Sequence, residues 1–175
     1  LLNLIQPDNG SLSVDNILIN NENNHIWQNK LGYVSQDVFI LNASIKENIA
    51  FGINPKHINH TLLKRVIEKS FLKDFISENK KGVDFVLSEN GENISGGQKQ
   101  RIGIARALYS GAEVLIFDES TSSLDEKNEI NILEAIYELS KLNHTIIMVS
   151  HKLNNLRKCN KIYTLKEGRL ILNEN

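Results

Sequence analysis

Two apolar runs in the second half of the chain give the first indication of the fold. Residues 114–117 (VLIF) and Thr145–Val149 (TIIMV) are each bounded by polar residues. Continuous apolar runs of this length are typical of strands that are buried on both faces of a parallel sheet. Leu31–Val34 predicts another strand, which ends at Gln36.

Helical spacing separates these predicted strands. Residues 58–67 and 71–76 repeat apolar positions every three or four residues. Further helices are expected from Ser95, as a cap, to about residue 109, over 125–142, and near 152–157. The residues expected to point inward from the two long helices are Ile102, Ala105 and Leu108, then Ile130, Leu133, Ile136 and Tyr137. Strands that alternate with helices predict an α/β fold with a mainly parallel sheet and a helical insertion over 52–90.

The ends of the chain show turn signals instead. The sequence PDNG at 7–10 predicts a turn, and residues 11–14 alternate as a short strand. Residues 80–91 are expected to form a loop. At the other end, 162–165 and 169–172 predict the two strands of a hairpin around the Lys-Glu-Gly turn at 166–168.

Composition narrows the class of protein without naming a function. The 175 residues suffice for one domain, and 41% hydrophobic with 23% charged residues is ordinary for a globular chain. The net charge of −1 gives no basic field that would indicate nucleic acid. The single cysteine excludes a disulfide framework and favours a reducing compartment. The apolar runs are too short to cross a bilayer.

Polar side chains follow both buried strands where each strand ends. Asp118 and Glu119 come directly after the first strand, and Ser150 and His151 follow the second. Ligands of open α/β sheets bind beyond the carboxyl ends of the strands. One carboxylate there can hold Mg²⁺ through water, and the other can orient or deprotonate a water molecule. The structural alternatives are a solvated acidic pair and an exposed histidine.

Three other features are weak signals when each is taken alone. The Ser95-Gly96-Gly97 start of a helix can bind an anion, or it can simply be a capped helix after a flexible turn. Gln36 at a strand tip can ligate Mg²⁺ or hold a water molecule, and it can equally have a purely structural role. Asp125 is well placed to cap the next helix.

Together and in this order, the motifs resemble the nucleotide-binding domain of ATP-binding cassette (ABC) transporters. ISGGQKQRIGIARAL resembles the ABC signature, with Ile94 in place of the usual leucine, and VLIFDES resembles Walker B. STSSLD resembles the D-loop, VSHK the switch-histidine loop, and YVSQ the Q-loop. The region WQNKLGYVSQDVFILNASIKENIAFG is similar to the exporter form. The resemblance covers nearly the whole chain.

This resemblance implies a P-loop NTPase-like fold, with a RecA-like sheet core and a helical subdomain at about 52–110. It also implies binding of ATP and Mg²⁺ and hydrolysis that powers export. Asp118 would coordinate Mg²⁺ through water, Glu119 would be the general base, and His151 would contact the γ-phosphate. Gln36 would sense the metal and the γ-phosphate and report to a membrane domain.

The remaining motif residues would act between two subunits. Ser95, Gly96, Gly97 and Gln98 would contact the nucleotide bound by a second nucleotide-binding domain. Asp125 would lie at the interface of that homo- or heterodimer. The expected location is the cytoplasmic face of the cell membrane, through a membrane domain that contacts the Q-loop region and selects the cargo.

The pattern G-x-x-x-x-G-K-[ST] of a P-loop (Walker A) does not occur in the 175 residues. Residues 91–96 fit its first six positions, but Gly97 and Gln98 stand where Lys and Ser or Thr are required. LLNLIQPDNGSLSVDN resembles the stretch just after the Walker A helix. The chain is therefore expected to be a partial domain, without its N-terminal strands and Walker A, and with little activity alone.

Three other functions were weighed against the exporter. DNA-repair and chromosome ABC ATPases carry long coiled coils between Q-loop and signature, but residues 37–94 show no sustained heptads. ABC translation factors carry two cassettes and a basic linker, which are not found here. A non-enzymatic partner that offers its signature to a complete subunit stays open as an alternative.

Overall fold

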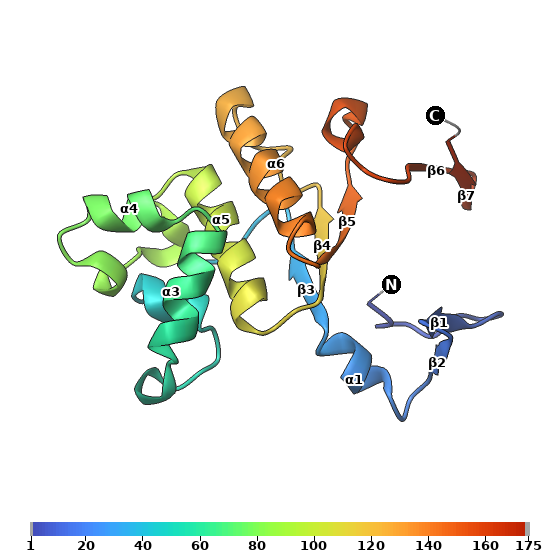
Figure 1. Ribbon diagram of the computed structural model, residues 1–175, viewed down its shortest axis with the longest axis horizontal. Helices are drawn as coiled ribbons and strands as arrows, with labels where there is room; N and C mark the ends of the chain where they lie inside the picture. Colours follow the sequence, from blue (N-terminus) through green and yellow to red (C-terminus); the bar gives the residue numbers. More distant parts are fainter. Residues whose placement is uncertain (1, 174–175) are drawn as a thin grey trace.

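A computed structural model describes residues 2–173 of the chain (Figure 1). The elements in chain order are β1 (Leu12–Val14), β2 (Ile17–Ile19), α1 (Asn24–Gln28), β3 (Leu31–Val34), α2 (Ile45–Ile49), α3 (His60–Lys69), α4 (Lys73–Glu78), α5 (Gly96–Tyr109), β4 (Val114–Asp118), α6 (Glu126–Ser140), β5 (Thr145–Val149), β6 (Tyr163–Lys166) and β7 (Arg169–Leu172). Short 3₁₀ turns lie at Pro55–His57, Gly82–Asp84, Glu89–Gly91 and Leu153–Leu156, two of them in the region predicted as loop.

The centre of the fold is a three-stranded parallel sheet in the order β3-β4-β5. Val34 pairs with Phe117, and Asp118 pairs with Val149, so the carboxyl ends of the strands share one edge. The prediction of an α/β fold with a mainly parallel core is confirmed. The four predicted segments 31–34, 95–109, 114–117 and 145–149 agree with the observed elements to within one residue at each end.

Helix α5 packs closely on β3. A β-carbon on Gly32 would come within 2.7 Å of the Ala107 side chain and 2.9 Å of Ala112, so only glycine permits this approach. Around this contact lies the hydrophobic core, to which the fully buried members Ile102, Ile104, Ala105, Leu115 and Phe117 belong. The inward face predicted for α5 is confirmed, because Ile102, Ala105 and Leu108 are all buried.

Helices α2, α3 and α4 gather on the side of α5 away from β4 (Figure 1). The short α2 was not predicted, although its sequence carries a capping box. Ser44 and Glu47 satisfy each other's backbone amides at its start. Ile45, Ile49 and Leu72 are fully buried between these helices, which gives this part of the chain its own share of the core.

Two burial predictions were wrong. Ile130 was expected to point inward from α6, but it is 50% exposed. The buried positions of this helix are Glu129, Ile132, Ala135, Ile136 and Leu139. A charged residue stands at the first position of this buried stripe, which explains why the apolar pattern placed the inner face one residue too late.

The second error concerns β5, which was predicted to be buried on both faces. Its middle residues are half-buried and Val149 is 50% exposed. Strand β5 pairs with β4 along one edge, and no other strand within residues 2–173 pairs with its second edge. Strand β5 therefore has a neighbouring strand at one edge only.

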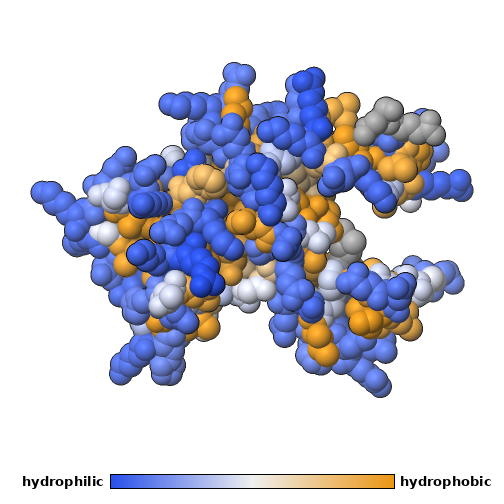
Figure 2. Space-filling view, in the orientation of Figure 1, coloured by the Kyte–Doolittle hydropathy of each residue, from blue (hydrophilic) through white to orange (hydrophobic). Residues whose placement is uncertain are grey.

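The two ends of the described chain form antiparallel hairpins, β1-β2 and β6-β7. In the second, Glu167 and Gly168 both adopt positive φ (50° and 77°), which is the two-residue turn that suits the twist of paired strands. This confirms the predicted hairpin. Both hairpins lie on the side of the sheet opposite to α3 and α4 (Figure 1), and apolar surface shows on them in Figure 2. No helix within residues 2–173 is both long and apolar enough for a membrane span.

Candidate functional site

The carboxyl edge of the sheet brings the two predicted polar clusters together. The amide of Glu119 donates to the Val149 carbonyl at 3.0 Å, which continues the β4-β5 pairing by one residue. His151 follows β5 after one residue and returns over this edge. His151 Nε2 lies 2.8 Å from Glu119 Oε1. Residues 32 positions apart in the chain thus form a carboxylate–imidazole pair.

The backbone at Glu119 adopts a conformation that is uncommon for a residue with a side chain. Its φ is 47°, in the left-handed region. The Ser122 hydroxyl donates to the Glu119 carbonyl at 2.8 Å and stabilises this turn. Backbone strain of this kind is concentrated at functional sites, where it aims a side chain. Here the turn leaves the carboxylate about one-third exposed beside the imidazole.

Asp118 contacts the neighbouring strand instead of the histidine. The Tyr33 hydroxyl donates to Asp118 Oδ2 at 2.9 Å. The hydrogen bond to this carboxylate, together with burial and the negative charge, raises the pKa of Tyr33. Tyr33 was not among the predicted site residues, although its place opposite residue 116 follows from the register of β3 and β4.

Gln36 is exposed and lies just beyond β3, but its side chain makes no hydrogen bond to Asp118 or Glu119. The main chain at Gln36 is instead hydrogen-bonded to helix α5. The buried amide of Gln100 on α5 donates to the Gln36 carbonyl at 2.6 Å and to the Ser35 carbonyl at 3.2 Å. Sequence reasoning missed Gln100, since nothing in its local pattern distinguishes a buried amide from an exposed one.

The Ser-Gly-Gly segment forms a capped helix start, as predicted. The Gln98 amide donates to Ser95 Oγ at 3.2 Å, and the Ser95 amide donates to Gln98 Oε1 at 2.8 Å. The helix therefore begins with a capping box, in which both side chains satisfy backbone amides of their own turn.

The two glycines of this segment lie against the loop that follows the carboxylates and against the first turn of α6. A β-carbon on Gly96 would lie 3.0 Å from the Leu124 side chain, and one on Gly97 would lie 2.9 Å from Asn128 Oδ1. Packing within this chain thus also favours glycine at both positions. The sequence suggested two reasons for the glycines, close approach to a ligand or a flexible turn before a capped helix, and did not reveal this packing.

Asp125 caps α6, as predicted. Its carboxylate accepts hydrogen bonds from the backbone amide of Asn128 at 3.0 Å and from the Asn128 side chain at 2.6 Å. The backbone hydrogen bond and then the side-chain one lower the pKa of Asp125. Asn128 therefore contacts both Asp125 and Gly97.

Comparison with known proteins decides the family. Residues 1–122 match the family model described as ABC transporter. The chain belongs to the ABC transporter family.

Two relatives are named as a transport protein and a flippase, and a solved structure with the same fold is named as an ABC exporter. The lactococcin-G-processing and transport ATP-binding protein LagD of Lactococcus lactis is 36% identical over 171 residues, which is 98% of this chain and 24% of LagD. The ATP-dependent lipid A-core flippase of Vibrio vulnificus YJ016 is 35% identical over 164 residues, 94% of this chain and 28% of the flippase. A bacterial Atm1-family ABC exporter with ATP bound superimposes with a TM-score of 0.83 at 30% identity, over 97% of this chain and 29% of that one.

The chain thus spans about a quarter of the length of the relatives that it matches. Its fold is that of an ABC ATPase domain, which confirms the predicted family and fold class. The segments that resemble Walker B and the switch-histidine loop meet at one edge of the sheet, and Gly96 of the segment that resembles the signature lies close to Leu124 of the segment that resembles the D-loop.

The carboxylates at this edge of the sheet suit Mg²⁺ when a bound nucleotide supplies other ligands of the ion. No group of three or more His, Cys, Asp or Glu side chains that could hold a metal occurs within residues 2–173. Mg²⁺ commonly uses one or two carboxylates, with water and substrate phosphates as its other ligands. Asp118, whose carboxylate accepts a single side-chain hydrogen bond, suits that arrangement.

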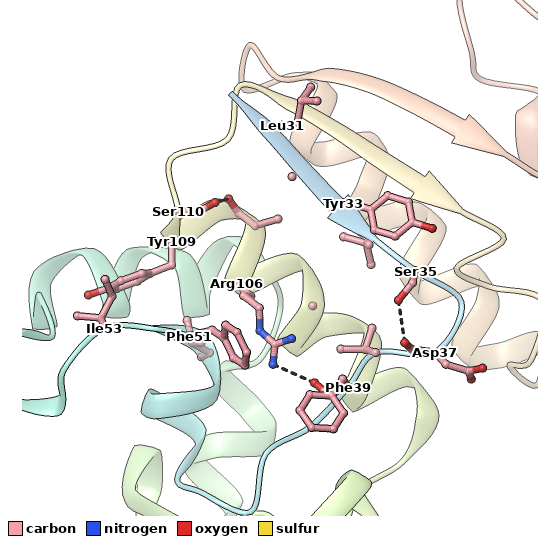
Figure 3. A pocket seen from close by; sticks show the side chains of 16 residues that line it. Leu31, Tyr33, Ser35, Asp37, Phe39, Phe51, Ile53, Arg106, Tyr109 and Ser110 are labelled. Carbon is pink, nitrogen blue, oxygen red and sulfur yellow. Dashed lines mark hydrogen bonds between the residues drawn. The ribbon is translucent and has the colours of Figure 1, made fainter. Parts of the chain in front are cut away.

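A groove of about 540 Å³ is lined by residues from three segments, 31–39, 49–53 and 103–110 (Figure 3). Arg106 of α5 reaches between Phe51 and Phe39, with its guanidinium carbon 4.6 Å from the centre of the Phe51 ring. It donates to the carbonyls of Asn48 and Phe39 at 3.0 and 3.1 Å. Burial lowers the pKa of Arg106. The groove thus presents half-exposed aromatic rings around a fixed cation.

Proposed function

We propose that the chain is the nucleotide-binding segment of an ABC exporter, which binds ATP with Mg²⁺ and hydrolyses it to drive transport. The observation that carries this proposal is the 2.8 Å contact between Glu119 and His151 at the carboxyl edge of the sheet. The carboxylate and the imidazole are both reachable by solvent. The carboxylate can take a proton from a water molecule, and the imidazole can hold a phosphate oxygen. The names of two relatives, a transport ATP-binding protein and an ATP-dependent flippase, and of a solved ABC exporter support the same activity.

In this proposal each residue of the edge has one role. Glu119 orients and deprotonates the attacking water, and His151 contacts the γ-phosphate. Asp118 holds Mg²⁺ through water, and Gln36 joins the metal when the nucleotide is bound. Bound ATP supplies the phosphate that is cleaved.

The signature is proposed to act on a second subunit. Ser95, Gly96, Gly97 and Gln98 would contact nucleotide held by the P-loop of another nucleotide-binding domain. The helix start offers the positive end of its dipole to that phosphate. Asp125 would lie at the interface of the two domains, where its contact with Asn128 links the interface to Gly97.

The decisive test compares two glutamates at opposite ends of β4 in the complete transporter. Glu119→Gln keeps the size of the side chain but removes its basicity, so ATP hydrolysis should fall by at least about a hundredfold while nucleotide binding is retained. Glu113→Gln is the matched control, because Glu113 is exposed and pairs with Lys30 away from the site. Equal rates for the two variants would overturn the proposal.

The isolated 175-residue chain should hydrolyse ATP negligibly, because its sequence has no G-x-x-x-x-G-K-[ST] pattern to hold the phosphates. The measurement is phosphate release from the purified chain. Robust turnover that Glu119→Gln abolishes would contradict this expectation. If the chain instead stimulates a complete nucleotide-binding domain and Glu119→Gln does not alter that effect, the non-enzymatic partner role would replace the enzymatic one.

The groove around Arg106 is proposed to receive the membrane domain on the cytoplasmic side of the membrane. Phe39, Phe51 and Ile53 are 57%, 48% and 45% exposed at its rim, which suits the apolar face of a short helix. Phe51→Ala should uncouple transport from ATP hydrolysis. Phe71→Ala removes a similarly exposed ring (44%) outside the groove and should leave coupling unchanged. Normal transport by Phe51→Ala would contradict this docking site.

The two named relatives carry different cargo, a lactococcin and a lipid A core. The proposal is accordingly limited to ATP-driven export.

A further inference from the structure

Glu129 is a buried carboxylate that the roles above do not use. It lies on the inner stripe of α6, in line with the buried Ile132 and Ile136, and is 8% exposed. A charge in such a position is costly unless it is paired and hydrogen-bonded. Its partners therefore show what the position does.

The partners come from the two segments that carry the proposed catalytic pair. The Thr121 hydroxyl donates to Glu129 Oε1 at 3.1 Å, and Thr121 lies two residues after Glu119. Lys152 Nζ donates to Glu129 Oε2 at 2.7 Å, and Lys152 directly follows His151. One carboxylate thus contacts both segments.

Asn155 closes the network. Its side-chain amide donates to Glu129 Oε1 at 2.8 Å and to Thr121 Oγ1 at 3.2 Å. Asn155 is itself buried, and its carbonyl accepts from the Tyr137 hydroxyl of α6. Thr121, Glu129 and Asn155 therefore form a closed triangle of hydrogen bonds behind the sheet edge.

The charge state of Glu129 agrees with this arrangement. Burial alone would raise the pKa of Glu129, but hydrogen bonds from Lys152, Asn155 and Thr121 outweigh it and lower the pKa. The carboxylate is therefore ionised at neutral pH and accepts all three bonds at once. Neither Lys152 nor Asn155 has another acidic partner in the hydrogen bonds and ion pairs of residues 2–173.

We infer that Glu129 is a positioning residue that holds the switch-histidine segment against the Walker B segment and so sets the contact between Glu119 and His151. This inference rests on the proposed ATPase function. Glu129 and Lys152 touch no reacting atom in it. They fix the main chain on either side of the catalytic pair, so that the imidazole returns to the same place over the carboxylate.

The test breaks the network from its exposed end, because replacing buried Glu129 would change the stability of the chain as well as the position of the segments. The Lys152 side chain is 53% exposed, so Lys152→Met removes the cation while keeping most of the volume. Lys152→Arg restores a charged donor. Lys141→Met is the matched control, since Lys141 also pairs with a glutamate of α6, Glu138 at 2.6 Å, but is remote from the site.

Two measurements are made on these variants. In the 175-residue chain, Lys152→Met should speed amide hydrogen exchange of residues 150–156 by about tenfold without a matching change in the core of β4. In the complete transporter it should lower kcat by about tenfold, with KM for ATP changed less than about twofold. Lys152→Arg should recover both values, and Lys141→Met should change neither.

The outcomes separate the two proposals. Faster exchange with unchanged kcat would show a purely structural contact and overturn the inference, and so would an equal effect of Lys141→Met. Unchanged exchange and unchanged kcat in Lys152→Met would overturn it as well, while leaving Glu119 as the base. Full turnover by Glu119→Gln would instead overturn the proposed function, on a variant that leaves the Glu129 network intact.

Discussion

The helical side of the molecule and the side formed by β5 and the hairpins differ in how completely they bury their apolar residues. Between β3, β4 and helices α2 to α5, the isoleucine and leucine side chains are almost all buried. On β5, β6 and β7, by contrast, Val149, Leu165, Leu170 and Leu172 are 50 to 71% exposed. The same chain thus contains a well-buried hydrophobic core and a largely exposed apolar surface (Figure 2).

The difference shows where stability and where association should originate. The part that carries the signature and the Q-loop is held by contacts within the chain. The unpaired edge of β5 and the apolar hairpins present surface that other chains can pair with or cover. Mutations in the two regions should therefore report different properties.

The largest difference in unfolding free energy is expected between two leucine-to-alanine variants, one in each region. Leu115→Ala empties a fully buried position of β4 and should lower the free energy of unfolding by about 2–5 kcal/mol. Leu165→Ala, where the side chain is 70% exposed, should change it by less than about 0.5 kcal/mol. Urea titrations of the two variants give both values. Similar losses would show that the hairpin is packed in solution.

The next effect concerns the contact between the signature and the D-loop. Gly97→Ala would place a β-carbon 2.9 Å from Asn128 Oδ1 and should cost about 1–3 kcal/mol through overpacking. In an Asn128→Ala background the cost of Gly97→Ala should be clearly smaller, since the opposing atoms are gone. A double-mutant cycle by urea unfolding measures the difference. Strict additivity would argue against the packing explanation.

A smaller effect is expected from acid. The pKa of Glu129 is lower in the folded chain than its ordinary value of 4.5, so its contribution to stability is fully present above pH 4.5. It is lost as the pH falls through the folded pKa, by about 1.4 kcal/mol for each unit of the shift. Stability measured from pH 6 to pH 3 should fall less steeply in Glu129→Gln than in the parent. Equal slopes would show that Glu129 is not ionised in the network.

The smallest effect on stability, and the clearest on association, is expected in the C-terminal hairpin. Replacing Leu165 and Leu170 with lysine should leave the unfolding free energy almost unchanged, because both side chains are about 70% exposed. Self-association of the chain at micromolar concentration should decrease, since charge on exposed strands opposes edge pairing. Sedimentation velocity measures this change. Unchanged self-association would show that the chain associates through a surface other than this hairpin.

The two regions also differ in how far the sequence predicted them. Strands β3 and β4 and helix α5 follow from the apolar pattern, β4 from a continuous apolar run and α5 from helical spacing. Glu119 and His151 follow from their places just after two parallel strands. These signals are local in sequence, so pattern reasoning could find them.

What the sequence missed depends on partners that are far apart in the chain. The exposure of β5 is a property of its unpaired edge, which an apolar run does not reveal. Tyr33 and Gln100 matter through contacts with Asp118 and with the Gln36 backbone, 85 and 64 residues away. Glu129 carries no signal in the sequence pattern, because its burial is accompanied by three donors that come from other segments.

The Gln100 amide has a mechanical consequence. It joins α5 to the main chain at Ser35 and Gln36, while the Gln36 side chain makes no hydrogen bond within residues 2–173. Helix α5 is also joined to the same segment at Phe39, whose carbonyl accepts a hydrogen bond from Arg106. A rotation of α5 would therefore move the main chain of the Q-loop at both places, and we expect the signature helix and the Q-loop to move together.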